Sequence, residues 1–205
     1  HLPLECSHLY LAIEGKLAAV ICVEDPLREE AADAVRELKE AGITKVVMMT
    51  GDSERTAAAI AKRVGVDEYY SEVLPEDKAS FVEKEKELGH KVIMIGDGIN
   101  DSLALSSASV GIAISDGAAI AREIADVTIS ADNLHEIVTL KRLSTALMKR
   151  IHNNYRTIIG INGGLIALGV TGIIMPTTSA LLHNMSTLTI SLRSMRNLLP
   201  KEEEA

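Results

Sequence analysis

Cysteine is scarce in this sequence, which holds only Cys6 and Cys22, at a spacing that matches no metal-binding or redox pair. Two such thiols suit a reducing environment, where both are expected to be packing residues. Positive charge is also in deficit. The net charge is -8 and no basic stripe offsets it, so the sequence gives no support to nucleic-acid binding.

The chain also lacks an initiator methionine, internal repeats and low-complexity tracts. His1-Leu2-Pro3 does not resemble a secretory signal, so we expect a piece of a longer protein. The composition combines two opposite tendencies: 24% of the residues are charged, yet mean hydropathy is +0.16. A polar globular part joined to a strongly apolar part would give this combination.

Short apolar runs alternate with amphipathic segments over the N-terminal two thirds of the chain. Residues 9–13 and 17–23 predict a strand pair, and Asp25-Pro26 predicts the start of a helix that ends near Gly42. Further strands are expected at 45–49, 68–70, 92–95, 110–114 and 127–129, and helices at 53–64, 75–88 and 118–125. This alternation predicts an α/β fold with a parallel sheet.

The uninterrupted apolar run at 92–95 predicts a fully buried parallel strand, and it leads into Gly96-Asp97-Gly98. Ligand sites of open α/β sheets lie beyond the carboxyl ends of the strands, and carboxylates are the hard oxygen ligands that Mg²⁺ prefers. We therefore predict a Mg²⁺ site at Asp97 and Asp101, with Asn100 adding a hydrogen bond. The alternative is a plain Asp-Gly bend, with Asp101 as a helix cap.

Two other loops carry groups that a phosphoryl-transfer site needs. Thr50 and Gly51 follow a predicted strand and offer a hydroxyl and free backbone N–H groups at a helix start, where the dipole favours an anion. Lys78 lies near the start of the helix predicted at 75–88 and offers a cation to a transferring phosphoryl group. The alternatives are a helix cap for Thr50 and a solvated surface charge for Lys78.

Together, three motifs resemble the haloacid dehalogenase-like phosphorylation domain of P-type ATPases: Thr50-Gly51-Asp52, Pro75-Glu76-Asp77-Lys78 and Gly96-Asp97-Gly98-Ile99-Asn100-Asp101. The resemblance covers essentially the whole chain. It implies bound Mg²⁺ at Asp97 and Asp101, and ATP held mainly by an upstream domain. It also implies catalytic roles for Thr50, Gly51, Asp52, Lys78 and Asn100.

The chain departs from the family pattern in two places. Leu103 stands where the family usually has Pro, which changes helix-start rigidity more than chemistry. The family's nucleophile is the Asp of an Asp-Lys-Thr-Gly-Thr motif, and no such stretch occurs in this sequence. Asp25 and Arg28 resemble the family's segment near the nucleotide-domain hinge, and we assign both a structural role. The nucleophile is therefore expected upstream of His1, and the chain alone is expected not to hydrolyse ATP.

The character of the sequence changes after Asn133. Residues 134–155 predict an amphipathic helix with cations at its far end, and residues 157–174 contain no charged side chain. As a helix, that uncharged stretch spans roughly 27 Å, close to the hydrocarbon thickness of a bilayer. Met175-Pro176 breaks the run and basic residues flank both outer ends. We therefore predict a transmembrane hairpin with cytoplasmic ends, the alternative being a hairpin buried in a soluble core.

The predicted fold class is α/β: a haloacid dehalogenase-like Rossmannoid parallel sheet followed by a two-helix transmembrane hairpin. Four parts follow from these boundaries. Residues 1–132 are the C-terminal part of a phosphorylation domain, 133–156 a stalk helix, 157–199 the transmembrane hairpin and 200–205 a polar tail.

Only two hydrophobic spans follow the phosphorylation domain, which resembles the heavy-metal (P1B) branch and implies ATP-driven transport of a transition-metal cation. Polar groups at membrane depth usually mark a transport path. The candidates are Asn162, His183, Asn184, Ser186 and Thr187. Imidazole suits Zn²⁺, Cu, Ni²⁺ or Co²⁺, and the choice among Zn, Co, Cu, Ni and Mn stays open. A plain helix–helix hydrogen bond is the alternative for His183.

The resemblance further implies an integral membrane protein in contact with the lipid bilayer, in the plasma (inner) membrane of a prokaryote, with its phosphorylation domain cytoplasmic. Phosphorylation of an upstream Asp would be coupled to metal translocation. Two other functions stay open. One is a soluble haloacid dehalogenase-type phosphatase with a helical cap, which needs an Asp-x-Asp-x-Thr-like nucleophile that this sequence lacks. The other is a non-catalytic split subunit of a pump, completed by a partner.

Overall fold

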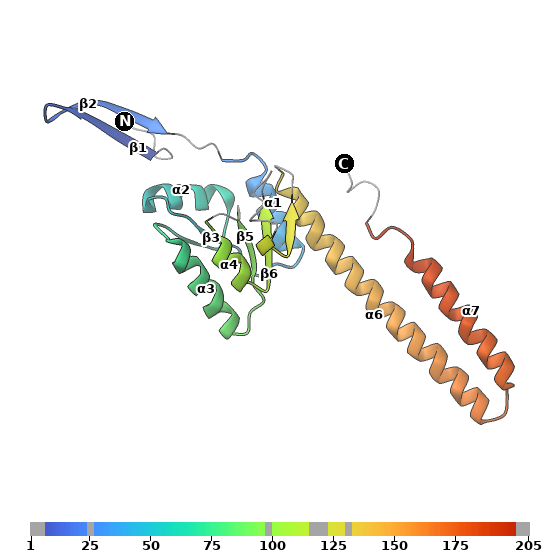
Figure 1. The fold of residues 1–205 in the computed structure, drawn as a ribbon. Helices are drawn as coiled ribbons and strands as arrows, with labels where there is room; N and C mark the ends of the chain where they lie inside the picture. Colours follow the sequence, from blue (N-terminus) through green and yellow to red (C-terminus); the bar gives the residue numbers. More distant parts are fainter. Residues whose placement is uncertain (1–6, 24–26, 97–99, 115–122, 130–132, 200–205) are drawn as a thin grey trace. The chain divides into compact units, whose positions relative to one another are not determined.

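The computed structural model describes residues 7–23, 27–96, 100–114, 123–129 and 133–199 (Figure 1). Internal contacts divide the chain into two units, residues 1–138 and 139–205. Asp25, Asp97 and most of the helix predicted at 118–125 lie outside the described residues.

The predicted strand pair is confirmed as an antiparallel hairpin, β1 (Ser7–Ile13) and β2 (Lys16–Val23). Its turn places Glu14 and Gly15 at φ values of 51° and 77°, in the left-handed region that glycine occupies without strain. The two strands form a sheet of their own. Their apolar side chains are largely exposed, with Leu9 at 61% and Leu17 at 63%.

The helix predicted to start at Asp25-Pro26 begins later than expected. α1 spans Ala31–Glu40, and the Ala31 N–H donates to the Arg28 carbonyl in a preceding turn (3.1 Å). Ala31 and Ala34 are the buried residues of this helix. Helices in proteins gain most of their stability from packing an apolar face, so α1 starts where that face starts and not at the proline.

The predicted parallel sheet is confirmed, in two pieces. β3 (Val47–Met49) pairs with β4 (Glu68–Tyr70). In the second piece, β6 (Val110–Ile114) lies between β5 (Ile93–Gly96) and β7 (Val127–Ile129). Among the described residues no strand joins β3 to β5, so each of these strands has an unpaired edge.

The prediction that the strand at 92–95 is fully buried was wrong. Ile93 is 40% exposed and the rest of β5 is half-buried. Burial is concentrated in β6, where Ile112 and Ala113 are 3% and 0% exposed. A parallel strand is buried on both faces when neighbouring elements flank it, and in the described part of the chain β5 pairs on one side alone.

Three helices connect these strands: α2 (Glu54–Val64), α3 (Pro75–Glu87) and α4 (Ser102–Ser107). The start of α2 is capped by the Ser53 hydroxyl, which accepts from the Thr56 N–H (3.4 Å), and Gly65 ends the helix at a φ of 79°. α3 packs against α4, where Val82 and Leu105 are almost completely buried. This contact places the start of α4 beside the first turns of α3.

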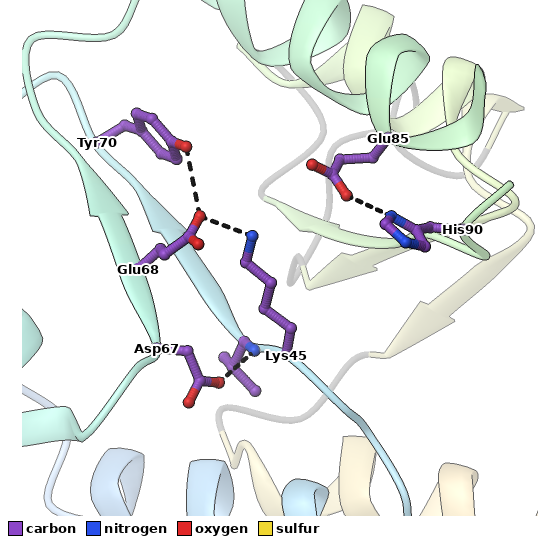
Figure 2. A network of polar contacts seen from close by, with 7 residues as sticks. Lys45, Asp67, Glu68, Tyr70, Glu85 and His90 are labelled. Atoms are coloured by element: carbon purple, nitrogen blue, oxygen red, sulfur yellow. Dashed lines mark hydrogen bonds and ion pairs between the residues drawn. The ribbon is translucent and has the colours of Figure 1, made fainter. Parts of the chain in front are cut away.

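Polar contacts tie β3 to β4 and to α1. Figure 2 shows Lys45 reaching Glu68, with 2.7 Å between Nζ and Oε2. The Val46 N–H donates to Asp67 Oδ2 (2.7 Å), and Lys39 of α1 binds the other oxygen of the same carboxylate at 2.7 Å. The Lys39 ammonium and this N–H hold the pKa of Asp67 below its usual range. The sheet register at β3 is therefore fixed by charge as well as by the backbone.

The C-terminal unit is a helical hairpin. α6 (His135–Val170) and α7 (Pro176–Ser194) run antiparallel beside one another (Figure 1). Arg150 of α6 donates to the carbonyl of Ser194 (3.0 Å), and Asn154 donates to its hydroxyl (2.7 Å). Most of the predicted stalk helix and residues 157–170 of the first predicted span therefore lie on one continuous helix.

The prediction of a transmembrane hairpin is not supported by the helices observed. In the parts of the chain that the structure describes, no helix combines the length and the apolar character needed to cross a membrane. The uncharged stretch at 157–174 runs past the end of α6 at Val170 into the turn before α7. α7 itself carries polar residues in its middle, among them His183 and Asn184.

Candidate functional site

Lys78 and Asp101 form an ion pair at the starts of α3 and α4. Lys78 Nζ lies 2.7 Å from Asp101 Oδ1, and the two side chains are 16% and 11% exposed. Lys78 is held there by a helix start in which Asp77 accepts from the Leu74 N–H (3.1 Å), with Pro75 as the first helical residue. Lys78 is therefore not the solvated surface charge that we weighed as an alternative.

The Asp101 carboxylate is not used as a helix cap. Asp101 occupies the N-cap position of α4, but its side chain makes no capping hydrogen bond to that helix. The residue is only 8% exposed, and its Oδ1 atom instead accepts a hydrogen bond from Lys78. A buried carboxylate that pairs with a cation and does not cap its own helix is typical of a functional site rather than of a helix cap.

Gly96 makes room for that carboxylate. A Cβ atom added at Gly96 would lie 2.7 Å from Asp101 Cβ and 2.9 Å from its Cγ, closer than real contacts allow. The last residue of β5 must therefore lack a side chain for Asp101 to fold back over it.

Thr50 follows β3 in a loop, and both of its backbone groups, the N–H and the carbonyl, are hydrogen-bonded. Its N–H donates to the Tyr70 carbonyl (3.0 Å) and its carbonyl accepts from the Val73 N–H (3.0 Å). The hydroxyl donates to Asp52 Oδ2 (2.6 Å) and accepts from the Asp52 N–H (3.1 Å). Thr50 is thus not the helix cap, a position that Ser53 takes. The Thr50 N–H, predicted to be free, is hydrogen-bonded within the protein.

The predicted site residues form two pairs in the described part of the chain. No hydrogen bond or ion pair between described residues joins the Thr50–Asp52 pair to the Lys78–Asp101 pair. Asn100 precedes Asp101 and is exposed, as are Gly51 and Arg28. Asp97 and Asp25 fall outside the described residues.

A carboxylate at the start of α2 was missed by the sequence analysis. Glu54 accepts from the Ser71 hydroxyl (2.6 Å) and the Tyr69 hydroxyl (2.8 Å). These two hydrogen bonds lower the pKa of Glu54, and the Glu54 carboxylate raises the pKa of Tyr69. An open surface depression of about 550 Å³ lies at the same place, lined by Glu54, Ser71 and residues 67–70. None of the predicted site residues that the structure describes lines it.

The candidates on the helical hairpin are only partly brought together. Asn162 of α6 and His183 of α7 are joined by a hydrogen bond of 2.8 Å between Oδ1 and Nδ1. The hydroxyls of Ser186 and Thr187 both donate to the His183 carbonyl, at 2.7 Å and 3.0 Å. Asn184 is exposed on α7. Across the described residues, no three His, Cys, Asp or Glu side chains gather as a metal site.

The arrangement of Thr50, Lys78 and Asp101 at strand and helix ends agrees with the comparison to known families. A model of the haloacid dehalogenase-like hydrolases matches residues 4–109, more than half of the chain. The chain belongs to this hydrolase family.

Its relatives are heavy-metal P-type ATPases, which confirms the resemblance seen in the sequence. The chain is 37% identical over 189 residues to a "Zinc-exporting P-type ATPase" of Mycobacterium marinum and 44% identical over 176 residues to "Copper-transporting ATPase 2" of Rhizobium meliloti. These alignments cover 92% and 86% of this chain but 26% and 21% of the relatives. The chain thus spans about a quarter of the length of the curated relatives that it matches.

A solved structure gives the same result. The crystal structure of a zinc-transporting PIB-type ATPase in the E2·Pi state matches with a TM-score of 0.83 and 30% sequence identity. The match covers 96% of this chain and 32% of the other.

Proposed function

We propose that this chain is part of an ATP-driven pump for a transition-metal cation, in which it supplies one half of a phosphoryl-transfer site. The family and the relatives support the class of pump. The single observation that carries the site is the Lys78–Asp101 pair, which holds a cation and a buried carboxylate 2.7 Å apart beside the carboxyl end of β5. Phosphoryl transfer relies on such fixed charges, because positioning and electrostatic stabilisation supply most of its catalysis.

Each residue of this half has a proposed task. Lys78 presents its ammonium group to the oxygens of a transferring phosphoryl group, and Asp101 keeps that ammonium group in place. Thr50 presents its hydroxyl, held ready by Asp52, to the same group. Asn100 orients the loop that carries Asp97.

The carboxylates also suit Mg²⁺, which prefers hard oxygen ligands. Asp101 fits such an ion because, among the described residues, its buried carboxylate is bound by Lys78 at Oδ1 alone and makes no cap hydrogen bond to α4. We propose that Asp97 and Asp101 hold Mg²⁺, which when bound offsets the charge of the phosphoryl oxygens.

The nucleophile has to come from another segment, because the sequence holds no Asp-Lys-Thr-Gly-Thr stretch. Two strands support a place for it. In the part of the chain that the structure describes, β3 and β5 each have an unpaired edge, and β5 is less buried than a central parallel strand should be. In the sequence, these strands lead directly into Thr50 and Asp97. We propose that the segment with the nucleophilic Asp pairs with these edges as a strand and that it belongs to an upstream part of the same pump, which also binds most of the ATP.

The helical hairpin carries the proposed cation-handling groups. Asn162 and His183 are in contact, while Asn184, Ser186 and Thr187 lie on the same stretch of α7. Export of a cation requires passage through a bilayer. We therefore propose that the whole protein is a membrane protein with residues 1–132 on the cytoplasmic side.

Metal-stimulated ATP hydrolysis tests this proposal. The full-length protein that contains this chain should hydrolyse ATP faster with one or more of Zn²⁺, Cu⁺, Co²⁺, Ni²⁺ and Mn²⁺. Residues 1–205 alone should hydrolyse none, and hydrolysis should return when a polypeptide bearing the Asp-Lys-Thr-Gly-Thr segment is added. Hydrolysis by residues 1–205 alone would refute the divided site, and no response to any of the five metals would refute the pump.

A further inference from the structure

The contact between Asn162 and His183 gives different roles to two residues that the sequence indicated together as candidate metal ligands. Oδ1 of Asn162 lies 2.8 Å from Nδ1 of His183. An amide oxygen accepts hydrogen bonds and cannot donate them, so with Oδ1 of Asn162 facing the ring this contact requires the imidazole proton on Nδ1. In the neutral ring the remaining lone pair is then on Nε2, the nitrogen that can bind a metal ion.

We infer that His183 is the metal ligand, through Nε2, and that Asn162 is a positioning residue that fixes its tautomer and ring orientation. Histidine ligands commonly donate their second ring N–H to an oxygen acceptor in this way. The inference deepens the proposed pump and rests on it for the cargo. An imidazole nitrogen suits Zn²⁺, Cu²⁺, Ni²⁺ or Co²⁺, and Zn²⁺ and Co²⁺ serve below as probes.

The hairpin holds both residues in one register. Nearer the open end of the hairpin, Asn154 donates to the Ser194 hydroxyl (2.7 Å), and Arg150 donates to the Ser194 carbonyl (3.0 Å). Like the Asn162–His183 contact, these contacts join α6 to α7, so together they keep the two helices from sliding past one another. The position of the imidazole is therefore set by packing and by a hydrogen bond, not by the metal alone.

The neighbouring hydroxyls have a lesser role in this arrangement. Ser186 and Thr187 each donate their hydroxyl proton to the His183 carbonyl. Both hydroxyls are thereby fixed to the backbone of the ligand's own helix turn. His183 is the strongest metal-binding group of this stretch, because its Nε2 lone pair is the one nitrogen donor among these side chains.

Direct metal binding to the full-length protein in detergent tests the inference without ATP. The probes are Co²⁺ and Zn²⁺, added as the metal alone, and the site in question is the one that His183→Ala removes. Asn162→Leu should weaken binding at that site by roughly 10- to 100-fold, because it removes the oxygen that fixes the ring. Asn162→Asp, which keeps an oxygen acceptor, should bind as tightly as the unaltered protein or more tightly.

The matched control is Asn154→Leu, which removes an interhelical hydrogen bond of similar length that involves no imidazole. Its metal affinity should stay within about twofold of the unaltered protein. X-ray absorption at the metal edge should show imidazole scattering in Asn162→Leu at saturating metal, and one imidazole fewer in His183→Ala.

Two results would overturn the inference. One is an unchanged affinity in His183→Ala; the other is an Asn162→Leu protein that binds like Asn154→Leu, which would make the contact a purely structural hydrogen bond. Failure of the pump proposal is distinguishable, since it would leave these affinities as predicted while no metal stimulates ATP hydrolysis.

Discussion

Lys78 and Asp101 are 23 positions apart in the sequence, yet their side chains meet at 2.7 Å where α3 and α4 begin. Two helix starts are thereby joined by one ion pair, in a place where both side chains are largely shielded from water. The pair links the loop after β5 to the first turns of α3. Any change that moves one partner should therefore affect both stability and chemistry.

Breaking the pair from one side should separate these two effects. Lys78→Met leaves the shielded Asp101 carboxylate without its partner and should lower the free energy of unfolding by about 1–3 kcal/mol. The double variant Lys78→Met with Asp101→Asn should recover part of that loss. It should still form no phosphoenzyme in the full-length protein. Urea unfolding and acid-stable phosphate labelling measure the two quantities, and normal labelling in the double variant would contradict the assigned roles.

Gly96→Ala should displace Asp101. The added Cβ would lie 2.7 Å from Asp101 Cβ, so the carboxylate has to move away from Lys78. We expect lower stability and a phosphoenzyme level close to that of Lys78→Met. Gly169→Ala in α6 is the control, because its Cβ would meet nothing within 4 Å and alanine favours a helix by up to about 1 kcal/mol. Equal behaviour of the two alanine variants would show that Gly96 has no steric role.

The Glu54 carboxylate should make stability depend on pH. Hydrogen bonds from Ser71 and Tyr69 lower its pKa in the folded chain. Its contribution is therefore complete above the unfolded pKa of about 4.3 and is lost as pH falls through the lower folded value. Glu54→Gln should flatten the dependence of unfolding free energy on pH between about 5 and 3.

The same substitution should lower the pKa of Tyr69, which the Glu54 carboxylate raises. Ultraviolet titration of the tyrosines measures that shift. Glu40→Gln is the control, since this carboxylate on α1 is 63% exposed. An unaltered pH dependence in Glu54→Gln would show that the two hydroxyls do not stabilise the charge.

Arg150 should hold the end of α7. Its guanidinium donates to the carbonyls of Ser194 (3.0 Å) and Asn197 (2.9 Å) and also to that of Arg196, which satisfies acceptors at a helix end. Arg150→Ala should speed amide hydrogen exchange in residues 194–199 by about tenfold, as expected for loss of hydrogen bonds to a charged donor.

Arg150→Lys should restore little of this protection, because one ammonium group cannot reproduce the planar fork of donors. Lys149→Ala, one position away on α6, should leave exchange unchanged. If both alanine variants exchange alike, the guanidinium does not secure the helix end.

The sequence predicted the elements whose signals are local. The bounds of β6 and β7 are those of their apolar runs, and Ser53 and Gly65 mark the ends of α2 as their residue types suggest. Thr50, Lys78 and Asp101 could be chosen because each stands at a strand end or helix start. The contact between Lys78 and Asp101 was not predicted. It depends on how α3 packs on α4, and no spacing in the sequence encodes that packing.

The errors have physical causes of the same kind. The start of α1 was placed by Pro26, but burial of Ala31 decides it. The apolar run at 92–95 is typical of a buried strand, yet the exposure of its side chains depends on whether a neighbouring strand is present.

The central claim is that the loop after β5 supplies half of a phosphoryl-transfer site, and phosphoenzyme formation tests it most directly. Asp97→Ala in the full-length protein, labelled with ATP carrying a radioactive γ-phosphate, should give no acid-stable phosphoenzyme. Glu40→Gln should label normally. Normal labelling of Asp97→Ala would contradict the account.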